Sequence, residues 1–195
     1  MTSYYGTHVR LKEITILLNR ANSIAGNVEN LTVYLDGNDY SQNDSIRKDF
    51  KCQAFFWQKG NSVESVPSTI ETFMNNPNVT HLIWLSKSLL DQEDIHVLWV
   101  YSHELRHFMQ AHGAVDILRI QSFLTKLHKQ EGFPVKATQL EMPKELDAEL
   151  FAKSIVEAVF GHTVLSDYIS LKRKEQNGDS YFQRFEYLEK LLSVK

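Results

Sequence analysis

Cysteine is almost absent from this sequence of 195 residues, in which Cys52 is the only one. No intramolecular disulfide is therefore available, and a metal site would have to be built from histidine, aspartate and glutamate side chains. An excess of one charge is absent as well. The chain has 21 lysine and arginine residues and 24 aspartate and glutamate residues, for a formal net charge of -3. Because acids and bases are mixed along the chain, we expect neither nucleic acid nor an anionic membrane as a partner.

Long apolar runs are missing too. Nowhere do about 18 apolar residues follow one another, which is the length that a membrane-spanning helix needs. The first residues, MTSYYGTHVRLKE, lack the basic start and the continuous apolar segment of a signal peptide. With 43% apolar and 23% charged residues, the chain has the composition of a folded domain of ordinary size. We therefore expect a single soluble, cytoplasmic domain.

The first 90 residues carry the patterns of both helices and strands. Apolar residues at steps of three and four predict a helix over residues 9–24, which Gly26 ends. A further helix is expected over residues 66–77. Three short runs rich in β-branched and aromatic residues predict strands at 31–35, 52–57 and 81–85. These strands are expected to form one small sheet.

The second half of the chain is expected to be helical throughout. Asp91 is a favourable N-cap and Gly113 a favourable residue after a helix end, so a helix is predicted between them. Further helices are predicted at about 115–130 and 143–160, and on either side of Asn177–Gly178. The sequence thus predicts an α+β fold, with a small mixed sheet of about three strands followed by a helical half.

The stretch WVYSHELRHFMQAHG, residues 99–113, carries the most informative pattern. On the predicted helix, His103 and His107 lie one turn apart on one face, so both imidazoles can reach the same ion. Glu104 lies about 100° around the axis, too far to be a third ligand but close enough to reach a water on that ion. This is the HExxH arrangement of zinc hydrolases. In these, zinc polarises the substrate carbonyl, and the glutamate takes the proton of the water and passes it to the leaving amine.

The surroundings of the motif favour a metal over buried histidines with other partners. Large apolar residues project from this helix in most directions, which predicts a helix buried on all sides. Such a helix should not carry His, Glu, Arg and His within five residues unless these side chains are paired or coordinated.

A catalytic zinc needs a third protein ligand and an open position for water. His112 follows His107 by five residues, where the pattern HExxHxxGxxH requires six, and we expect it to favour the helix C-terminus instead. Better candidates lie on the predicted helix 143–160. Glu145 falls on its expected buried face, where a carboxylate requires a partner, and Asp147, the alternative, falls at an edge of that face.

Helical geometry also predicts a role for Glu149. The buried face expected for this helix consists of seven apolar residues, Ala148, Phe151, Ala152, Ile155, Val156, Ala158 and Val159. Glu145 and Glu149 are one turn apart, so if Glu145 binds the metal, Glu149 can hold the far nitrogen of a ligand histidine. Asp147 cannot share that arrangement with Glu145, because the two point about 160° apart.

With these residues, the sequence resembles the gluzincins, whose third zinc ligand is a glutamate on a later helix. More narrowly, it resembles the small ImmA/IrrE-type metallopeptidases of bacteria and their phages. The parallels are the strand HLIWL before the active-site helix, HELRH with Arg106 where that family commonly has glycine, and ELDAELFA in place of E-x-x-A-N-x-F-A. The resemblance implies a minimal zincin-like fold, Glu145 as a zinc ligand and Glu149 in place of an asparagine. It also implies that strand 81–85 is the edge that pairs with an extended peptide.

The sequence does not rank the groups that would stabilise a developing oxyanion. The candidates are His81, Tyr101, Tyr168 and His162. His96 is expected to pack behind the site.

We therefore predict a peptidase that acts on peptide or protein substrates, with Zn2+ held by His103, His107 and Glu145 and with Glu104 as general base. The single domain, 1–195, would consist of an N-terminal α/β part (1–90), metal-binding helices (91–160) and a helical C-terminal extension (161–195). A zinc-stabilised binding module without hydrolysis and a metal-free helical interaction domain are the alternatives.

Overall fold

The computed structural model describes residues 1–26, 28–40, 53–61, 66–113, 117–131, 140, 142–175 and 178–193. Cys52, the first residue of the predicted strand 52–57, lies outside these residues. Across the described ranges, none of the helices combines the length and the apolar character needed to cross a membrane.

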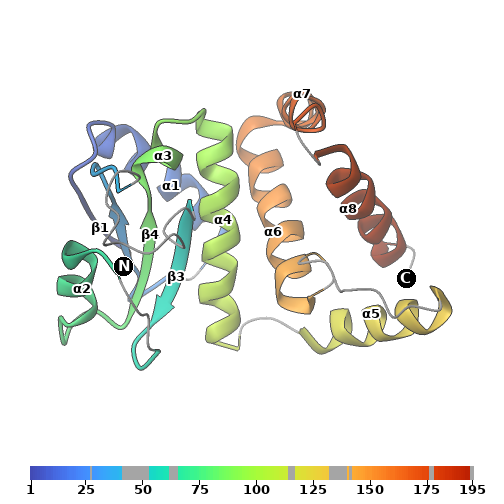
Figure 1. The fold of residues 1–195 in the computed structure, drawn as a ribbon, viewed down its shortest axis with the longest axis horizontal. Helices are drawn as coiled ribbons and strands as arrows, with labels where there is room; N and C mark the ends of the chain where they lie inside the picture. Colours follow the sequence, from blue (N-terminus) through green and yellow to red (C-terminus); the bar gives the residue numbers. More distant parts are fainter. Residues whose placement is uncertain are drawn as a thin grey trace.

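The described residues form a mixed sheet of four strands in the order β1-β2-β4-β3 (Figure 1). The strands are β1 (Ser3–Gly6), β2 (Thr32–Leu35), β3 (Ala54–Gln58) and β4 (His81–Leu85). The first, second and fourth are parallel, whereas β3 runs antiparallel to β4. The small mixed sheet is confirmed, but the expected number of three strands is wrong. The sequence analysis does not predict β1, because this strand has four residues, all exposed or half-exposed, and no buried apolar run.

Eight helices are present in the described part of the chain, and the last five are its only regular elements after residue 93. The eight are α1 (Leu11–Ala25), α2 (Ser68–Met74), α3 (Lys87–Leu90), α4 (Asp94–Ala111), α5 (Ile117–Glu131), α6 (Pro143–Phe160), α7 (His162–Lys172) and α8 (Gly178–Ser193). The α+β fold with its helical half is confirmed. One boundary differs: Asp91, the predicted N-cap, closes the short helix α3, and α4 begins after Glu93. The reason is Ser86, whose hydroxyl accepts a hydrogen bond from the N–H of Leu89 and starts helical structure earlier.

The strand expected to pair with a peptide is not at an edge of the sheet. β4 lies between β2 and β3 and is hydrogen-bonded on both sides. The implied role of strand 81–85 is therefore wrong, because β3 pairs along its outer side. The edge next to α4 belongs to β3, and the two elements are in contact.

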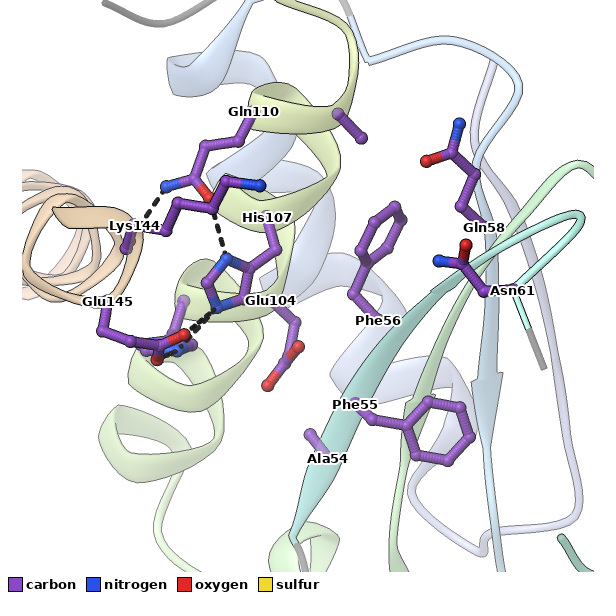
Figure 2. Close-up of a pocket in the computed structure, with 12 residues that line it drawn as sticks. Ala54, Phe55, Phe56, Gln58, Asn61, Glu104, His107, Gln110, Lys144 and Glu145 are labelled. Atoms are coloured by element: carbon purple, nitrogen blue, oxygen red, sulfur yellow. Dashed lines mark hydrogen bonds and ion pairs between the residues drawn. The ribbon is translucent and has the colours of Figure 1, made fainter. Parts of the chain in front are cut away.

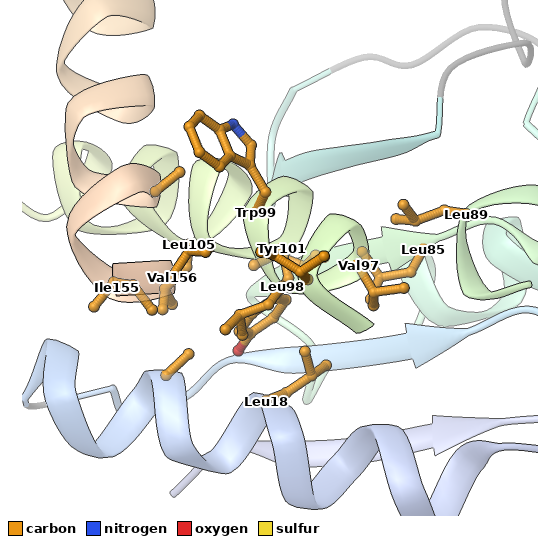
Figure 3. Close-up of a cluster of buried hydrophobic side chains, with 14 of the residues drawn as sticks. Leu18, Leu85, Leu89, Val97, Leu98, Trp99, Tyr101, Leu105, Ile155 and Val156 are labelled. Atoms are coloured by element: carbon orange, nitrogen blue, oxygen red, sulfur yellow. The ribbon is translucent and has the colours of Figure 1, made fainter. Parts of the chain in front are cut away.

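The two faces of the sheet are covered by different helices (Figure 1). Along β4, Ile83 and Leu85 belong to the main core with α1, α4 and α6, whereas Leu82 and Trp84 belong to a smaller core with α2. Helix α4 runs through the main core (Figure 3). Seven of its side chains there are at most 7% exposed: Ile95, Val97, Leu98, Trp99, Tyr101, Leu105 and Phe108. This burial, which the sequence predicts, means that the polar residues of HELRH must find partners within the protein.

Helix α6 is buried more broadly than its sequence suggests. Leu146 is fully buried although it lies outside the expected face, and Asp147 is buried rather than at an edge. Ala158, expected on that face, is exposed. The reason is that α6 packs against α1, α4, α5 and α7 rather than against a single neighbour.

Candidate metal centre

Three potential metal ligands from two helices meet beside the first turn of α6. The Nε2 atoms of His103 and His107, both on α4, are 3.1 Å apart. Oxygens of Glu145, on α6, lie 3.3 Å from Nε2 of His103 and 3.6 Å from Nε2 of His107. Ligand atoms at about 2.0 to 2.1 Å from a tetrahedral zinc are about 3.3 Å from one another. The three separations therefore fit such an ion, and no second group of this kind occurs among the residues that the structure describes. We call these three residues the triad.

The proton on His107 is fixed by Gln110, which lies almost one turn further along α4 (Figure 2). The side-chain nitrogen of Gln110 donates to the main-chain oxygen of Lys144 and to a carboxylate oxygen of Asp147, at 2.9 Å in both cases. Because both partners are acceptors, the amide oxygen of Gln110 must be the atom that faces Nδ1 of His107, 2.9 Å away. Nδ1 therefore carries the proton, and the lone pair of Nε2 points into the triad.

His103 is supported from behind by Glu149. Its Nδ1 atom lies 3.0 Å from one carboxylate oxygen of Glu149, and the indole N–H of Trp99 donates to the other oxygen at 2.8 Å. The contact with Nδ1 is an ion pair whose angle falls short of a regular hydrogen bond. Glu149 thus lies where the spacing from Glu145 predicts, at the far nitrogen of a triad histidine.

The charges of the triad depend strongly on one another. Burial opposes a proton on His103, but the carboxylates of Glu145 and Glu149 outweigh it and raise its pKa to about 10. Burial also lowers the pKa of His107, and Glu145 and Gln110 reverse this and raise it. Without a metal, a proton on His103 therefore supplies positive charge beside Glu145, and a divalent cation that displaced this proton would supply the charge instead and bind both Nε2 lone pairs.

A cleft of about 510 Å³ opens between β3, the second half of α4 and the first turn of α6. All three members of the triad line this cleft, together with Glu104 of α4 and Lys144 of α6. The labelled side chains in Figure 2 show Glu145 and His107 on one side of it and Phe56 of β3 on the other. A substrate in the cleft would therefore lie between the triad and the edge of the sheet.

Glu104 reaches from α4 toward β3, beside the triad (Figure 2). Burial raises the pKa of its carboxyl group, and the neighbouring charges of His103 and His107 offset only part of the rise. The N–H of Phe56 donates a hydrogen bond to this carboxylate. A carboxylate with a raised pKa at an open cleft is suited to take a proton and release it again.

The main chain of β3 faces the cleft with alternate residues. The main chains of Gln53 and Lys59 are hydrogen-bonded to residues at the two ends of β4. Successive residues of a strand direct their N–H and C=O groups to opposite sides. The groups directed to the side away from β4 are therefore those of Ala54, Phe56 and Gln58.

Asp147, the alternative third ligand, belongs to a different pair. It accepts hydrogen bonds of 2.7 and 3.0 Å from the guanidinium of Arg106, in addition to the one from Gln110. The cation of Arg106 is permanent, so the negative charge of Asp147 is compensated without a metal. This pair also explains why HELRH contains arginine, since the side chain of Arg106 spans the distance from α4 to α6.

Two other residues singled out from the sequence lie away from the cleft. Tyr101 is fully buried and donates a hydrogen bond to Asn22 on α1. His162 is exposed at the start of α7, where its ring lies 2.9 Å from Glu157. Neither lines the cleft, so we do not propose them as oxyanion donors.

The remaining histidines have partners of their own. His81 contacts the ring of His112, with 4.5 Å between the centroids. His112 is the C-cap that follows the last residue of α4, and its Nδ1 atom hydrogen-bonds to the carbonyl of Phe108, as expected for a residue that favours the helix C-terminus. Nδ1 of His96 and the hydroxyl of Tyr168 are joined by a hydrogen bond of 2.7 Å. None of these four ring systems, His81, His96, His112 and Tyr168, lines the cleft.

The sequence analysis does not identify Trp99 and Gln110 as parts of the site. Both carried a usable signal, because Trp99 lies four residues before His103 and Gln110 three residues after His107, on the same faces of α4. Lys144 lines the cleft only because it precedes Glu145 on the first turn of α6, which no spacing rule marks.

Comparisons with known proteins identify no relative of this chain. No family model matches the chain, and searches of curated proteins and of solved structures return no match.

Proposed function

We propose that this chain is a zinc-dependent peptidase that hydrolyses peptide bonds in the cleft beside the triad. One observation carries the proposal: the ligand atoms of His103, His107 and Glu145 converge at separations that suit zinc, and Glu104 stands next to them in an open cleft. A structural zinc site has four protein ligands as a rule, whereas three ligands and an adjacent carboxylate are the arrangement of a hydrolytic site.

Different residues of the cleft would have different roles in the reaction. Zinc held by the triad would polarise the scissile carbonyl and lower the pKa of the attacking water. Glu104 would take the proton from that water and deliver it to the amine of the departing segment. The hydrogen bond from Phe56 would keep the Glu104 carboxylate oriented between the water and the leaving group.

The substrate would bind as an extended peptide along β3. The main-chain groups of Ala54 and Gln58 point toward the cleft side of the strand and can pair with the main chain of a peptide. Such pairing holds the scissile bond beside the triad and makes few demands on the side chains of the substrate. We therefore expect peptides or unstructured protein segments as substrates.

The test combines metal analysis with the cleavage of a peptide library. The purified protein should contain about one zinc per chain and cleave the library, and a chelator should abolish cleavage. Glu104→Gln should lower the rate about 100- to 10,000-fold and retain its zinc. Glu157→Gln, a change of the same kind on the outer side of α6, should keep both zinc and activity.

Each other outcome points to a different function. Cleavage at the wild-type rate by Glu104→Gln would remove Glu104 from the mechanism. Zinc that stabilises the protein without any cleavage would indicate a zinc-stabilised binding module. A protein that contains no metal and does not change its melting temperature with added zinc would be a metal-free interaction domain.

A further inference from the structure

A second, smaller cavity of about 200 Å³ adjoins the triad and brings the end of the chain to it. It is lined by His103, Leu140, Glu145, Glu149 and Tyr181. Tyr181 lies on α8, in the C-terminal extension, and no motif in the sequence marks it. The extension therefore contributes a side chain directly beside the triad.

Tyr181 and the carboxylate of Glu149 line the same small cavity, and the phenol is close enough for that carboxylate to act on its pKa. Burial and the negative charge of Glu149 raise the pKa of this phenol, so it keeps its proton and can act as a donor. Glu149 is the residue that lies 3.0 Å from Nδ1 of His103. Tyr181 on α8 is thus connected to the triad residue His103 through one side chain, the carboxylate of Glu149.

A second line of contacts connects α8 to the same carboxylate. Trp99 donates its indole N–H to Glu149 at 2.8 Å. Phe182 and Phe185 of α8 pack edge-on against its ring, with centroids at 6.3 and 6.4 Å. Tyr168 of α7 packs against it in a tilted arrangement, with a centroid distance of 5.8 Å. Since these rings fix the orientation of the indole, the extension restrains both side-chain donors beside Glu149.

The helix α8 is also tied to α6, the helix that carries Glu149. Lys153 of α6 lies 2.6 Å from Glu189 of α8. This pair lies about two turns from Tyr181 along α8, so the helix is attached at two separate points. Tyr181 is therefore held beside Glu149 by a docked helix.

We propose that α8 is a working part of the metal centre and that Tyr181 is a positioning residue for the metal ligand His103. With Tyr181 and Trp99 both donating to Glu149, its carboxylate is fixed before a metal arrives and holds the His103 ring in the orientation that directs Nε2 into the triad. Groups that orient a ligand in this way commonly change metal affinity by about 10- to 100-fold when they are removed. The inference rests on the proposed zinc centre and assigns the C-terminal extension a role in it.

The test removes the hydroxyl and keeps the ring. In Tyr181→Phe, zinc affinity measured by competition with a chromogenic chelator should fall about 3- to 10-fold, less than the loss for groups that hold a ligand directly, because Tyr181 acts through Glu149. The visible spectrum of the Co2+-loaded protein should shift as well, because the His103 ring is less restrained. Tyr187→Phe, the same change at an exposed position of α8, should leave affinity and spectrum unchanged.

A double variant tests whether Tyr181 affects zinc binding through Glu149. If Tyr181 acts through Glu149, adding Tyr181→Phe to Glu149→Gln should cause no further loss of affinity, whereas an additive loss would overturn that route. Unchanged affinity and an unchanged Co2+ spectrum in Tyr181→Phe would overturn the positioning role while the zinc centre stands. A wild-type protein that binds no zinc would instead overturn the proposed function itself.

Discussion

Two carboxylates on α6, two residues apart, show opposite ways of keeping an acid within a protein. Asp147 receives both hydrogen bonds of the Arg106 guanidinium and one from Gln110. Glu145 faces two imidazoles whose Nε2 atoms are directed at the same point. The first site is complete with the residues that are present, because its cation is permanent. The second has ligands without a permanent cation, which is why we expect a metal at Glu145 and not at Asp147.

The comparison also separates stability from metal binding. The Arg106–Asp147 pair joins α4 to α6 whether or not a metal is bound, whereas the contacts of Glu145 become favourable with positive charge between the ligands. Substitutions at the two sites should therefore have different signatures, one in the free energy of unfolding and the other in zinc affinity.

The largest effect is expected at the Arg106 pair. Arg106→Leu leaves Asp147 buried without its cation and should lower the free energy of unfolding by about 3 kcal/mol. Denaturant unfolding in the presence of a chelator measures this without a contribution from metal. The double variant Arg106→Leu, Asp147→Leu should regain most of the loss, and a single variant as stable as the wild type would show that the pair does not hold the helices together.

Removal of Glu145 should act on the metal instead. Glu145→Ala takes away one of three ligands and should weaken zinc binding by more than about 100-fold, beyond the effect of groups that only orient a ligand. Its stability without metal should fall less than that of Arg106→Leu. Competition with a chelator provides the measurement, with Glu157→Ala as the matched control, and wild-type zinc affinity in Glu145→Ala would contradict the assignment.

A smaller effect is expected at the residue that contacts both sites. Gln110→Met removes the acceptor that fixes the proton on His107 and should weaken zinc binding about tenfold. Gln183→Met on α8 changes the same side chain at an exposed position and should bind zinc normally. If the two variants bound zinc equally well, the tautomer of His107 would not depend on Gln110.

The smallest effect tests a histidine of the same helix that lacks a carboxylate beside its ring. Burial and the charge of Lys172 lower the pKa of His96 to about 4, and Glu175 offsets this only in part. In the unfolded chain the pKa is about 6.5, so the unfolded state binds the extra proton first as the pH falls. The contribution of neutral His96 is complete above about pH 6.5 and is lost as the pH falls toward 4.

The measurement compares wild type with His96→Gln at pH 7 and pH 4.5, with a chelator present. The wild type should lose about 1 kcal/mol more than the variant over this interval, since the ring is only partly covered and solvent screens its charge. Equal losses in the two proteins would mean that His96 titrates alike in the folded and unfolded states.

The parts of the site that follow from local helical geometry could be predicted from the sequence. His103, His107 and Glu104 follow from one helix, and the positions of Glu145 and Glu149 follow from steps of about 100° along another. Asp147 could not be assigned in this way, because its partner Arg106 is long enough to bring an edge position into the buried interface. Tyr181 could not be placed at all, since its approach depends on how α8 docks, and no periodicity in the sequence specifies that.

The sheet shows the same limit. The strands 31–35 and 81–85 are recognisable by their apolar residues, but their order in the sheet is not a property of either segment. β3 pairs outside β4 and takes over the edge, so the peptide-binding role that a resemblance attached to strand 81–85 falls to residues of another strand. To predict the order of the strands, β1 would have had to be recognised as well, and its four residues give almost no sequence signal.

The Arg106–Asp147 pair has a consequence for metal exchange. Because it spans α4 and α6 without using any triad residue, we expect that the removal of an ion would leave the helices in register and the ligands within reach of one another. The binding of a new ion would then not have to fold the site, in contrast to small domains that fold only when the metal binds. We expect that the same molecules could be stripped and reloaded with Co2+ or Cd2+, because the affinity of a histidine and carboxylate site for divalent metals follows a general order rather than selecting zinc. The ion carried in a cell would thus be set by which metal is supplied there.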